Sequence, residues 1–284
     1  MPQSKSIDMF SKIALAIAFS PRMEALLAEA KRIKSIFGAE LLLIHVGEKT
    51  SESESKLQNL IEQQGLIGTD IKTLWEEGNP AKKILKVCDQ NNVDLLIAGA
   101  LKTEGFFKYY LGSIARKIIR KSKCSVLVLI EPMIKPEPFD RVVINGTQQE
   151  QTPYVIEQGL NWCKKDKAKQ VYIANEIKMY GLQMATASEG GEDEIAATRR
   201  KLISEEITYV ENILKHLDKG NLKISIKITC GKWAIELARF ATDVKADLLI
   251  VGDEGNLGFF HRLFPHDLEE ILSDLPCNLL IVKK

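Results

Sequence analysis

The chain has 284 residues, which suits two domains of ordinary size, each large enough for its own core. A net charge of +1 argues against a nucleic-acid polymer or an anionic membrane as the main partner. Five scattered cysteines, no apolar run of the roughly 18 residues that a membrane span needs, and no apolar signal-peptide core at the start lead us to expect a cytoplasmic protein.

The first part of the chain alternates short apolar runs with amphipathic stretches, which is typical of buried strands alternating with helices. Ser20-Pro21 predicts the start of the first helix, and Gly38 predicts its end. The strands are expected at 13–19, 41–46, 71–75, 95–98 and 126–130, and the helices after Ser20 and at 51–64, 78–91 and 113–121.

A stretch with three prolines, 131–138, cannot continue a helix or a central strand and is the expected linker. We therefore place a first domain at 1–131, a linker at 132–138 and a second domain at 139–284. The second domain should repeat the pattern, with strands at 141–145, 171–174, 224–228, 248–251 and 279–282, and helices at 154–165, 195–217, 233–242 and 266–274.

The second domain is about 26 residues longer between its second and third strands. This extra part includes an acidic stretch, 188–194, and the long helix at 195–217. We expect that helix to pack on its own domain, and an interaction surface is the alternative.

The two parts are copies of each other. Asp94, Gly99, Phe106 and Cys124 each have an identical residue 153 positions later, and the copies stay in register from Gly78 onward. The chain is therefore a tandem duplication. Strands that alternate with helices imply right-handed crossovers, so the expected fold is α/β: two tandem open parallel five-stranded sheets flanked by helices. The equivalent Cys124 and Cys277 are expected to be small buried apolar residues rather than redox groups.

Ligands of such sheets bind beyond the carboxyl ends of the strands, at the point where the strand order reverses. In the first domain Gly99 ends the fourth strand and Gly112-Ser113 opens the next helix, so backbone N–H groups can approach a phosphate there. In the second domain Gly252, Gly255 and Gly258 precede a helix start at Pro265-His266, where three carboxylates, Asp267, Glu269 and Glu270, would repel a phosphate. We expect phosphate binding in the first domain.

The pattern resembles the universal stress protein family over nearly the whole chain, twice. The resemblance rests on the glycine signature after strand four, His45-Val46 after strand two, Gly78-x-Pro80 after strand three, and the cysteine before the last strand. It implies an adenine nucleotide alpha hydrolase-like fold with strand order 3-2-1-4-5. It also implies a site for ATP or AMP with Mg, formed by Val46, Gly99, Lys102, Gly112 and Ser113, and in the second domain by Asn145, Gly252 and Gly255.

The sequence departs from the family pattern in both domains. The Asp that ends the family's first strand is Ala18 here, and the second signature glycine is Lys102, which either meets phosphates or is a solvated loop lysine. The second domain has Asn145-Gly146-Thr147 in place of Asp-Gly-Ser, and Pro265-His266 in place of Gly-Ser. The first domain therefore keeps more of the family's phosphate-binding pattern, and the second domain keeps more of its nucleoside-binding pattern.

No P-loop, HExxH or GxSxG motif is present, so we expect a regulatory binding module in the stress response rather than an enzyme. The alternatives are an interaction protein with vestigial pockets and a slow ATP hydrolase. The resemblance further implies that the two domains pair within the chain, through 126–130 and 279–282, as an intramolecular pseudo-dimer; further homodimerisation stays open.

Overall fold

The computed structural model describes residues 9–102, 109–177, 192–253, 271–272 and 274–284. Two compact units share the chain: residues 1–138 with 280–284 form the first, and residues 139–279 form the second. The predicted linker, 132–138, falls in the first unit, and the predicted domain boundaries stay a prediction. In the described part of the chain, no helix is both long enough and apolar enough to cross a membrane.

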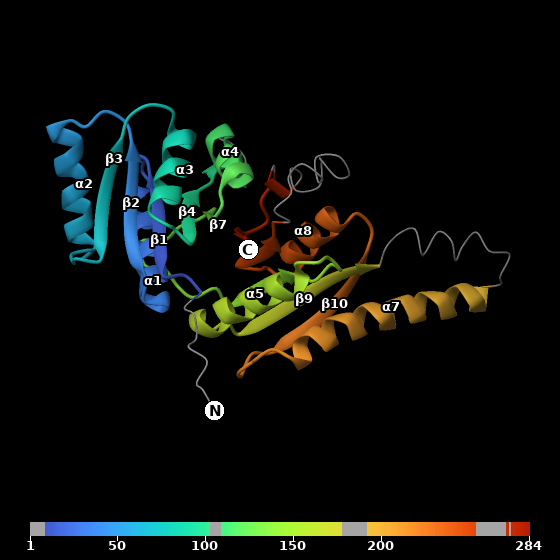
Figure 1. Ribbon diagram of the computed structural model, residues 1–284. Helices are drawn as coiled ribbons and strands as arrows, with labels where there is room; N and C mark the ends of the chain where they lie inside the picture. The colour runs from blue at the N-terminus through green and yellow to red at the C-terminus, as the bar shows by residue number, and fades with distance from the viewer. Residues whose placement is uncertain (1–8, 103–108, 178–191, 254–270, 273) are drawn as a thin grey trace. The chain divides into compact units, whose positions relative to one another are not determined.

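The first unit is built on a parallel sheet with the strand order β3-β2-β1-β4-β7, which confirms the predicted order 3-2-1-4-5 (Figure 1). Its strands are β1 (Lys12–Ile17), β2 (Glu40–Val46), β3 (Ile71–Glu76), β4 (Leu95–Gly99) and β7 (Ser125–Leu129). The central strands are buried on both faces because helices cover them, which explains their continuous apolar sequences.

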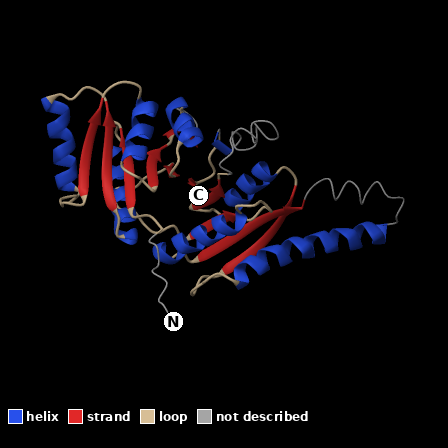
Figure 2. Cartoon of the chain, viewed as in Figure 1, coloured by secondary structure: helices blue, strands red, loops and turns tan. Residues whose placement is uncertain are grey.

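Four helices of the first unit connect these strands: α1 (Met23–Phe37), α2 (Ser51–Gln63), α3 (Pro80–Gln90) and α4 (Ser113–Lys121) (Figure 2). Helix α1 ends as predicted, at Gly38 with a left-handed φ of 66°. Its predicted start is wrong, because the helix begins at Met23 with Arg22 as its N-cap, and not at Ser20-Pro21. Two short antiparallel strands, β5 (Leu101–Lys102) and β6 (Tyr109–Tyr110), were not predicted.

The second unit contains parallel strands in the order β10-β9-β8-β11, which repeats the order of the first four strands of the first unit. They are β8 (Arg141–Asn145), β9 (Gln170–Ile177), β10 (Ile224–Cys230) and β11 (Leu248–Gly252), with helices α5 (Thr152–Asp166), α7 (Glu192–Lys215) and α8 (Trp233–Asp243). The long helix α7 packs on β9 and β10 and buries Val210 and Leu214, so it does pack on its own domain. Most of the predicted acidic stretch and of the predicted helix at 266–274 lies outside the described residues.

The chain's last strand, β12 (Asn278–Val282), lies next to β7 in the sheet order, and residues 280–284 cluster with the first unit. Backbone N–H of Lys283 donates to Ser125 Oγ at 3.1 Å. Its ammonium donates to the carbonyl oxygens of Ile119 and Ser122, at 2.8 and 2.6 Å. The first unit is thus completed by residues from the far end of the chain.

Candidate functional site

The carboxyl ends of the first unit's strands carry the predicted site residues of the first domain. Val46 is the half-buried last residue of β2, opposite Glu76 of β3, and Gly99 is the last residue of β4, opposite Leu129 of β7. A Cβ at Gly99 would lie 3.2 Å from Leu26 Cδ1, so α1 packs closely on this glycine. Parallel strands end at one edge of the sheet, so both residues lie on the edge where ligands of this fold bind.

The N-terminus of α4 lies beside Leu101, two residues after Gly99. Gly112 is the N-cap and Ser113 the exposed first helical residue. A Cβ at Gly112 would lie 2.8 Å from Cδ1 of the exposed Leu101 in β5. The Leu101 side chain therefore occupies the space that a side chain at position 112 would need. The first turn of α4 has no acidic side chain to neutralise the positive end of the helix dipole. Lys102 lies in β5, opposite Tyr109 of β6.

Two arginines that were not predicted add positive charge at this edge. Arg22, at the start of α1, donates through both terminal nitrogens to Ala100 O after β4 and Ile130 O after β7. Arg116, in the first turn of α4, donates through Nε to Leu111 O at 2.8 Å. The pattern Ser-Pro-Arg after the first strand was the signal for Arg22, but only the tertiary structure shows which carbonyl groups it reaches.

An aromatic cluster fills the ends of β1, β2 and β3. The His45 ring lies 4.8 Å from the Phe19 ring and 4.6 Å from the Trp75 ring, and its Nδ1 lies 3.2 Å from Ile17 O. Phe19 and Trp75 are half-buried, and Lys56 Nζ lies 5.8 Å from the Phe19 ring centre. Ala18 is exposed beside them. The first domain therefore offers ring surfaces and no carboxylate at the position where the family has its Asp.

In the second unit, Asn145 ends β8 and Gly252 ends the neighbouring β11, so these two predicted residues share an edge. Asn145 is buried, and its Oδ1 accepts from the backbone N–H and the hydroxyl of Thr147, at 3.2 and 2.8 Å. A Cβ at Gly252 would lie 2.6 Å from Val155 Cγ2. Gly255 and the helix start at Pro265 lie outside the described residues.

Polar side chains at this second edge bond to one another. Glu206 of α7 accepts from Asn175 Nδ2 at 2.7 Å and from Gln148 Nε2 at 3.0 Å. Tyr209, one turn further along α7, has its pKa raised mainly by burial; the hydrogen bond with Thr152 acts against this, and the charge of the nearby Glu206 adds to it. The polar side chains at this edge, including Asn145, which was expected to contact a nucleoside, are thus hydrogen-bonded to other residues of the second unit. Helix α7 supplies one of these partners, Glu206.

The arrangement suits binding and contains no recognisable catalytic constellation among the described residues. Nor does the described part of the chain hold a group of three or more His, Cys, Asp or Glu side chains that could coordinate a metal ion.

The match to a known family falls on the part of the chain that carries the first edge. Residues 47–129 match the model of the Universal stress protein family. This part of the first unit is therefore similar to universal stress proteins.

Relatives and solved structures agree with this identification. A universal stress protein of Methanocaldococcus jannaschii is 23% identical over 154 residues, which cover 43% of this chain and 95% of the relative. Universal stress protein YxiE of Bacillus subtilis is 26% identical and covers 43% of this chain and 99% of its own length. These curated relatives are therefore about one domain long.

Two solved structures are similar to the chain over nearly its full length. One is a protein of unknown function from Pseudomonas aeruginosa, with a TM-score of 0.70 and 16% identity over 99% of this chain and 95% of that one. The other is a universal stress protein from Archaeoglobus fulgidus, with a TM-score of 0.61 and 14% identity over 98% of this chain and 97% of that one. At these identities the likeness shows a shared fold.

Proposed function

We propose that the protein is a tandem universal stress protein that acts as a non-catalytic, nucleotide-responsive module in the stress response. An adenine nucleotide, ATP or AMP, binds at the strand-end edge of the first domain. Its phosphates lie at the N-terminus of α4. The observation that carries this proposal is that α4 begins at a glycine N-cap, Gly112, with no acidic side chain in its first turn, near Gly99 and the Arg22 guanidinium.

Each part of this edge suits a phosphate for a physical reason. Free N–H groups at a helix start together with the helix dipole attract an anion, and Gly112 lets the backbone approach it. Arg22 and Arg116 are held by carbonyl oxygens, which are weaker partners than a phosphate, so they are positioned to turn toward one. The second domain offers no comparable edge in its described part, because Glu206 adds negative charge there.

The nucleoside end of this site has lost its carboxylate. Ala18 is exposed, and the half-buried rings of Phe19 and Trp75 are what the first domain offers instead. Ring surfaces bind any base with little selectivity, since every base has a flat face. We therefore expect weak discrimination between adenine and guanine nucleotides.

The test is a thermal melt of the full-length protein, freed of nucleotide by dialysis, with and without Mg-ATP or Mg-AMP. Binding to the native state raises the melting temperature by mass action, and a concentration about 100 times Kd adds about 2.7 kcal/mol. Gly112→Val should abolish the shift, because its branched side chain covers the start of α4. Ile114→Ala, on the exposed side of the same helix, should keep it.

A second candidate, a protein-interaction module with vestigial pockets, is favoured by the close packing of Leu26 on Gly99. It predicts no melting shift with any nucleotide, whereas the proposed function requires one in the wild type. A shift that survives Gly112→Val would show that a nucleotide binds elsewhere and would contradict the proposed site.

A further inference from the structure

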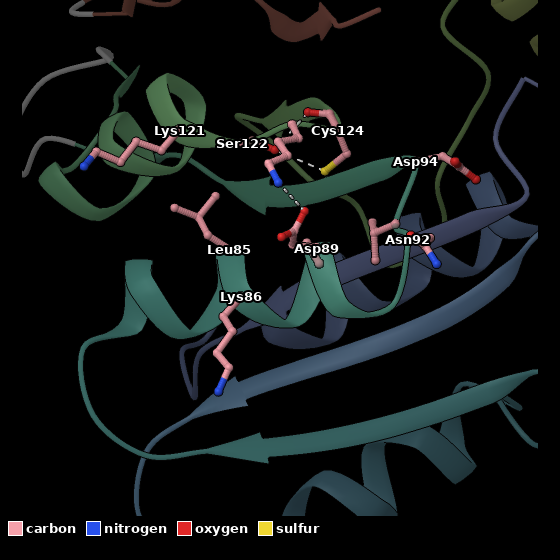
Figure 3. Close-up of a pocket in the computed structure, with 11 residues that line it drawn as sticks. Leu85, Lys86, Asp89, Asn92, Asp94, Lys121, Ser122 and Cys124 are labelled. Carbon is pink, nitrogen blue, oxygen red and sulfur yellow. Dashed lines mark hydrogen bonds and ion pairs between the residues drawn. The ribbon is translucent and has the colours of Figure 1, made fainter.

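A pocket of about 550 Å³ lies in the first unit at the amino ends of β4 and β7, the edge opposite to the proposed nucleotide site (Figure 3). It is formed by the last turns of α3, the turn that leads into β4, and the turn between α4 and β7. Two cysteines, Cys88 of α3 and Cys124 just before β7, line it together.

Backbone hydrogen bonds hold the segments that carry these cysteines against each other. Val93 N donates to Cys88 O at 3.0 Å, which fastens the end of α3 to the start of β4. Ser125 N donates to Asp94 O at 3.1 Å, which fastens the start of β4 to the start of β7. The two cysteines line the same pocket as a result, although 35 residues lie between them in sequence.

The two thiols have different surroundings. Cys88 is 5% exposed, whereas Cys124 keeps part of its surface open to the pocket. The Ser122 hydroxyl lies 3.1 Å from Cys124 Sγ, as Figure 3 shows, and Lys283 Nζ is held nearby on Ser122 O at 2.6 Å. Cys124 therefore has a hydroxyl group and a cation nearby, while Cys88 is enclosed.

These contacts separate the pKa values of the two groups. The neighbouring Cys88 thiol is the main cause that lowers the pKa of Cys124 to about 7, and Ser122 and the charge of Lys283 act in the same direction against burial. Cys124 in turn, followed by burial, raises the pKa of Cys88. Near neutral pH, Cys124 is thus substantially ionised and Cys88 keeps its proton.

Charged side chains of both signs surround the pocket, so no single one of them determines the electrostatic potential inside it. Lys123 pairs with Asp89 at 2.8 Å, and Asp94 accepts from Ser11 and from the backbone of Lys12. The charged groups on the elements around the pair are Lys86, Asp89, Asp94, Lys121, Lys123 and Lys283.

The duplication supplies an internal comparison. Cys277 occupies the position of Cys124 in the second copy, 153 residues later, but Ala241 stands at the position of Cys88 and Leu275 at that of Ser122. Cys277 is 4% exposed, and burial raises its pKa. The expectation that both equivalent cysteines are inert buried residues therefore describes Cys277 and not Cys124.

We propose that Cys88 and Cys124 are a redox modification site, in which a hydroperoxide converts the two thiols into a reversible intramolecular disulfide. Cys124 is the attacking group because it is the more accessible and more acidic thiol, and Cys88 is the resolving group because it lines the same pocket. The first domain would then carry an oxidant response that the second domain lacks.

The reaction balances in two steps. The Cys124 thiolate attacks one oxygen of the hydroperoxide, the O–O bond breaks, and the leaving alkoxide or hydroxide takes a proton from water, which leaves a sulfenic acid on Cys124. The Cys88 sulfur then attacks the Cys124 sulfur, the S–O bond breaks, and the hydroxyl leaves as water with the proton of Cys88. The two sulfurs lose two electrons in total, which the peroxide gains, and a dithiol reductant reverses the change.

The test exposes the full-length protein to hydrogen peroxide, blocks the remaining thiols, and maps them by mass spectrometry. We expect a linked peptide pair that contains Cys88 and Cys124, which disappears after treatment with dithiothreitol. Before oxidation, iodoacetamide at pH 7 should modify Cys124 at least about tenfold faster than Cys277, because the thiolate is the reacting form. A wild-type protein without the linked pair, or with Cys277 oxidised as readily as Cys124, would overturn the proposal.

Single variants separate the two roles. In Cys88→Ala the sulfenic acid on Cys124 should persist and be trapped by dimedone, whereas Cys124→Ala should leave Cys88 unmodified. Alanine is the natural residue at the equivalent position 241, so Cys88→Ala should fold, and a thermal melt checks this. Cys277→Ala is the matched control and should form the linked pair as the wild type does. Oxidation of Cys88 in the Cys124→Ala variant would contradict the assigned order.

Discussion

At the scale of single residues, side-chain partners separate the two copies of the domain. Arg22 reaches two carbonyl oxygens at the ends of β4 and β7, and this places a cation at the edge of the first sheet. At the corresponding edge of the second sheet, Asn145 is turned toward Thr147, and Glu206 binds Asn175. The edge of the first sheet therefore carries a positive charge, whereas the polar side chains at the edge of the second sheet are hydrogen-bonded to one another, although the two sheets share their strand order.

Replacing Arg22 by alanine should destabilise the first unit. The change leaves Ala100 O and Ile130 O without their guanidinium donor, and the loss of such a partner costs about 1–3 kcal/mol. Urea unfolding followed by circular dichroism measures the free energy of unfolding. Arg141→Ala, an exposed arginine at the start of β8, is the control and should change it by less than about 0.5 kcal/mol. Equal losses of unfolding free energy in both variants would show that the Arg22 contacts add no more stability than an exposed arginine does.

At the scale of elements, close helix–strand packing sets the spacing of the layers. Gly159 in the middle of α5 faces Ile144 of β8, and a Cβ added there would lie 2.7 Å from Ile144 Cδ1 and 3.1 Å from its Cγ1. Ile144 is fully buried, so its side chain has no room to withdraw. A glycine inside this helix is thus explained by the approach of α5 to the sheet.

Gly159→Ala accordingly tests two opposing effects. Helix propensity favours alanine by about 1 kcal/mol, whereas overpacking a close-packed core costs about 1–3 kcal/mol. We expect the cost of overpacking to exceed the gain in helix propensity, so that the second unit loses about 1 kcal/mol of unfolding free energy. A lower urea midpoint at an unchanged slope would measure this loss. Glu157→Ala, exposed on the same helix, serves as the control. A higher midpoint for Gly159→Ala would show that β8 and α5 can move apart without cost.

At the scale of the whole molecule, the chain's last residues belong to its first unit. Residues 280–284 cluster with 1–138, and Lys283 bonds the C-terminal carbonyl groups of α4, where a cation also complements the helix dipole. The first unit is therefore complete only after the entire second domain has been synthesised. The same lysine lies beside Cys124, so it connects the chain's end to the proposed redox site.

Lys283→Ala should weaken the first unit and leave the second largely unchanged. It removes two charge-assisted hydrogen bonds, which are worth about 1.5–3 kcal/mol each in the general case. Hydrogen exchange read by mass spectrometry should show faster exchange in β7 and α4 than in β8 and β9. The neighbouring exposed Lys284, changed to alanine, is the control. Identical exchange in both variants would mean that solvent replaces the Lys283 bonds without loss.

Much of the fold followed from the sequence because its signals are local or repeated. Apolar runs and the 153-residue repeat predicted the tandem α/β plan, and α4 and β8 have the predicted bounds, 113–121 and 141–145. The position of Gly99 at the end of β4 and of Gly112 at the start of α4 also followed from the sequence, because glycines directly after an apolar run and before an amphipathic stretch are local signals. The start of α1 was missed because Arg22 takes the N-cap position that Ser20 was expected to fill.

The sequence by itself thus determined the order of the elements and the internal repeat, since both depend on periodicity, chain direction or spacing along the chain. Only the tertiary structure decided which groups meet across long separations. It brought Arg22 to Ala100 and Ile130, Glu206 to Asn175, and Cys88 to Cys124. Such pairs depend on how helices and strands pack, and packing brings together residues that no local pattern connects.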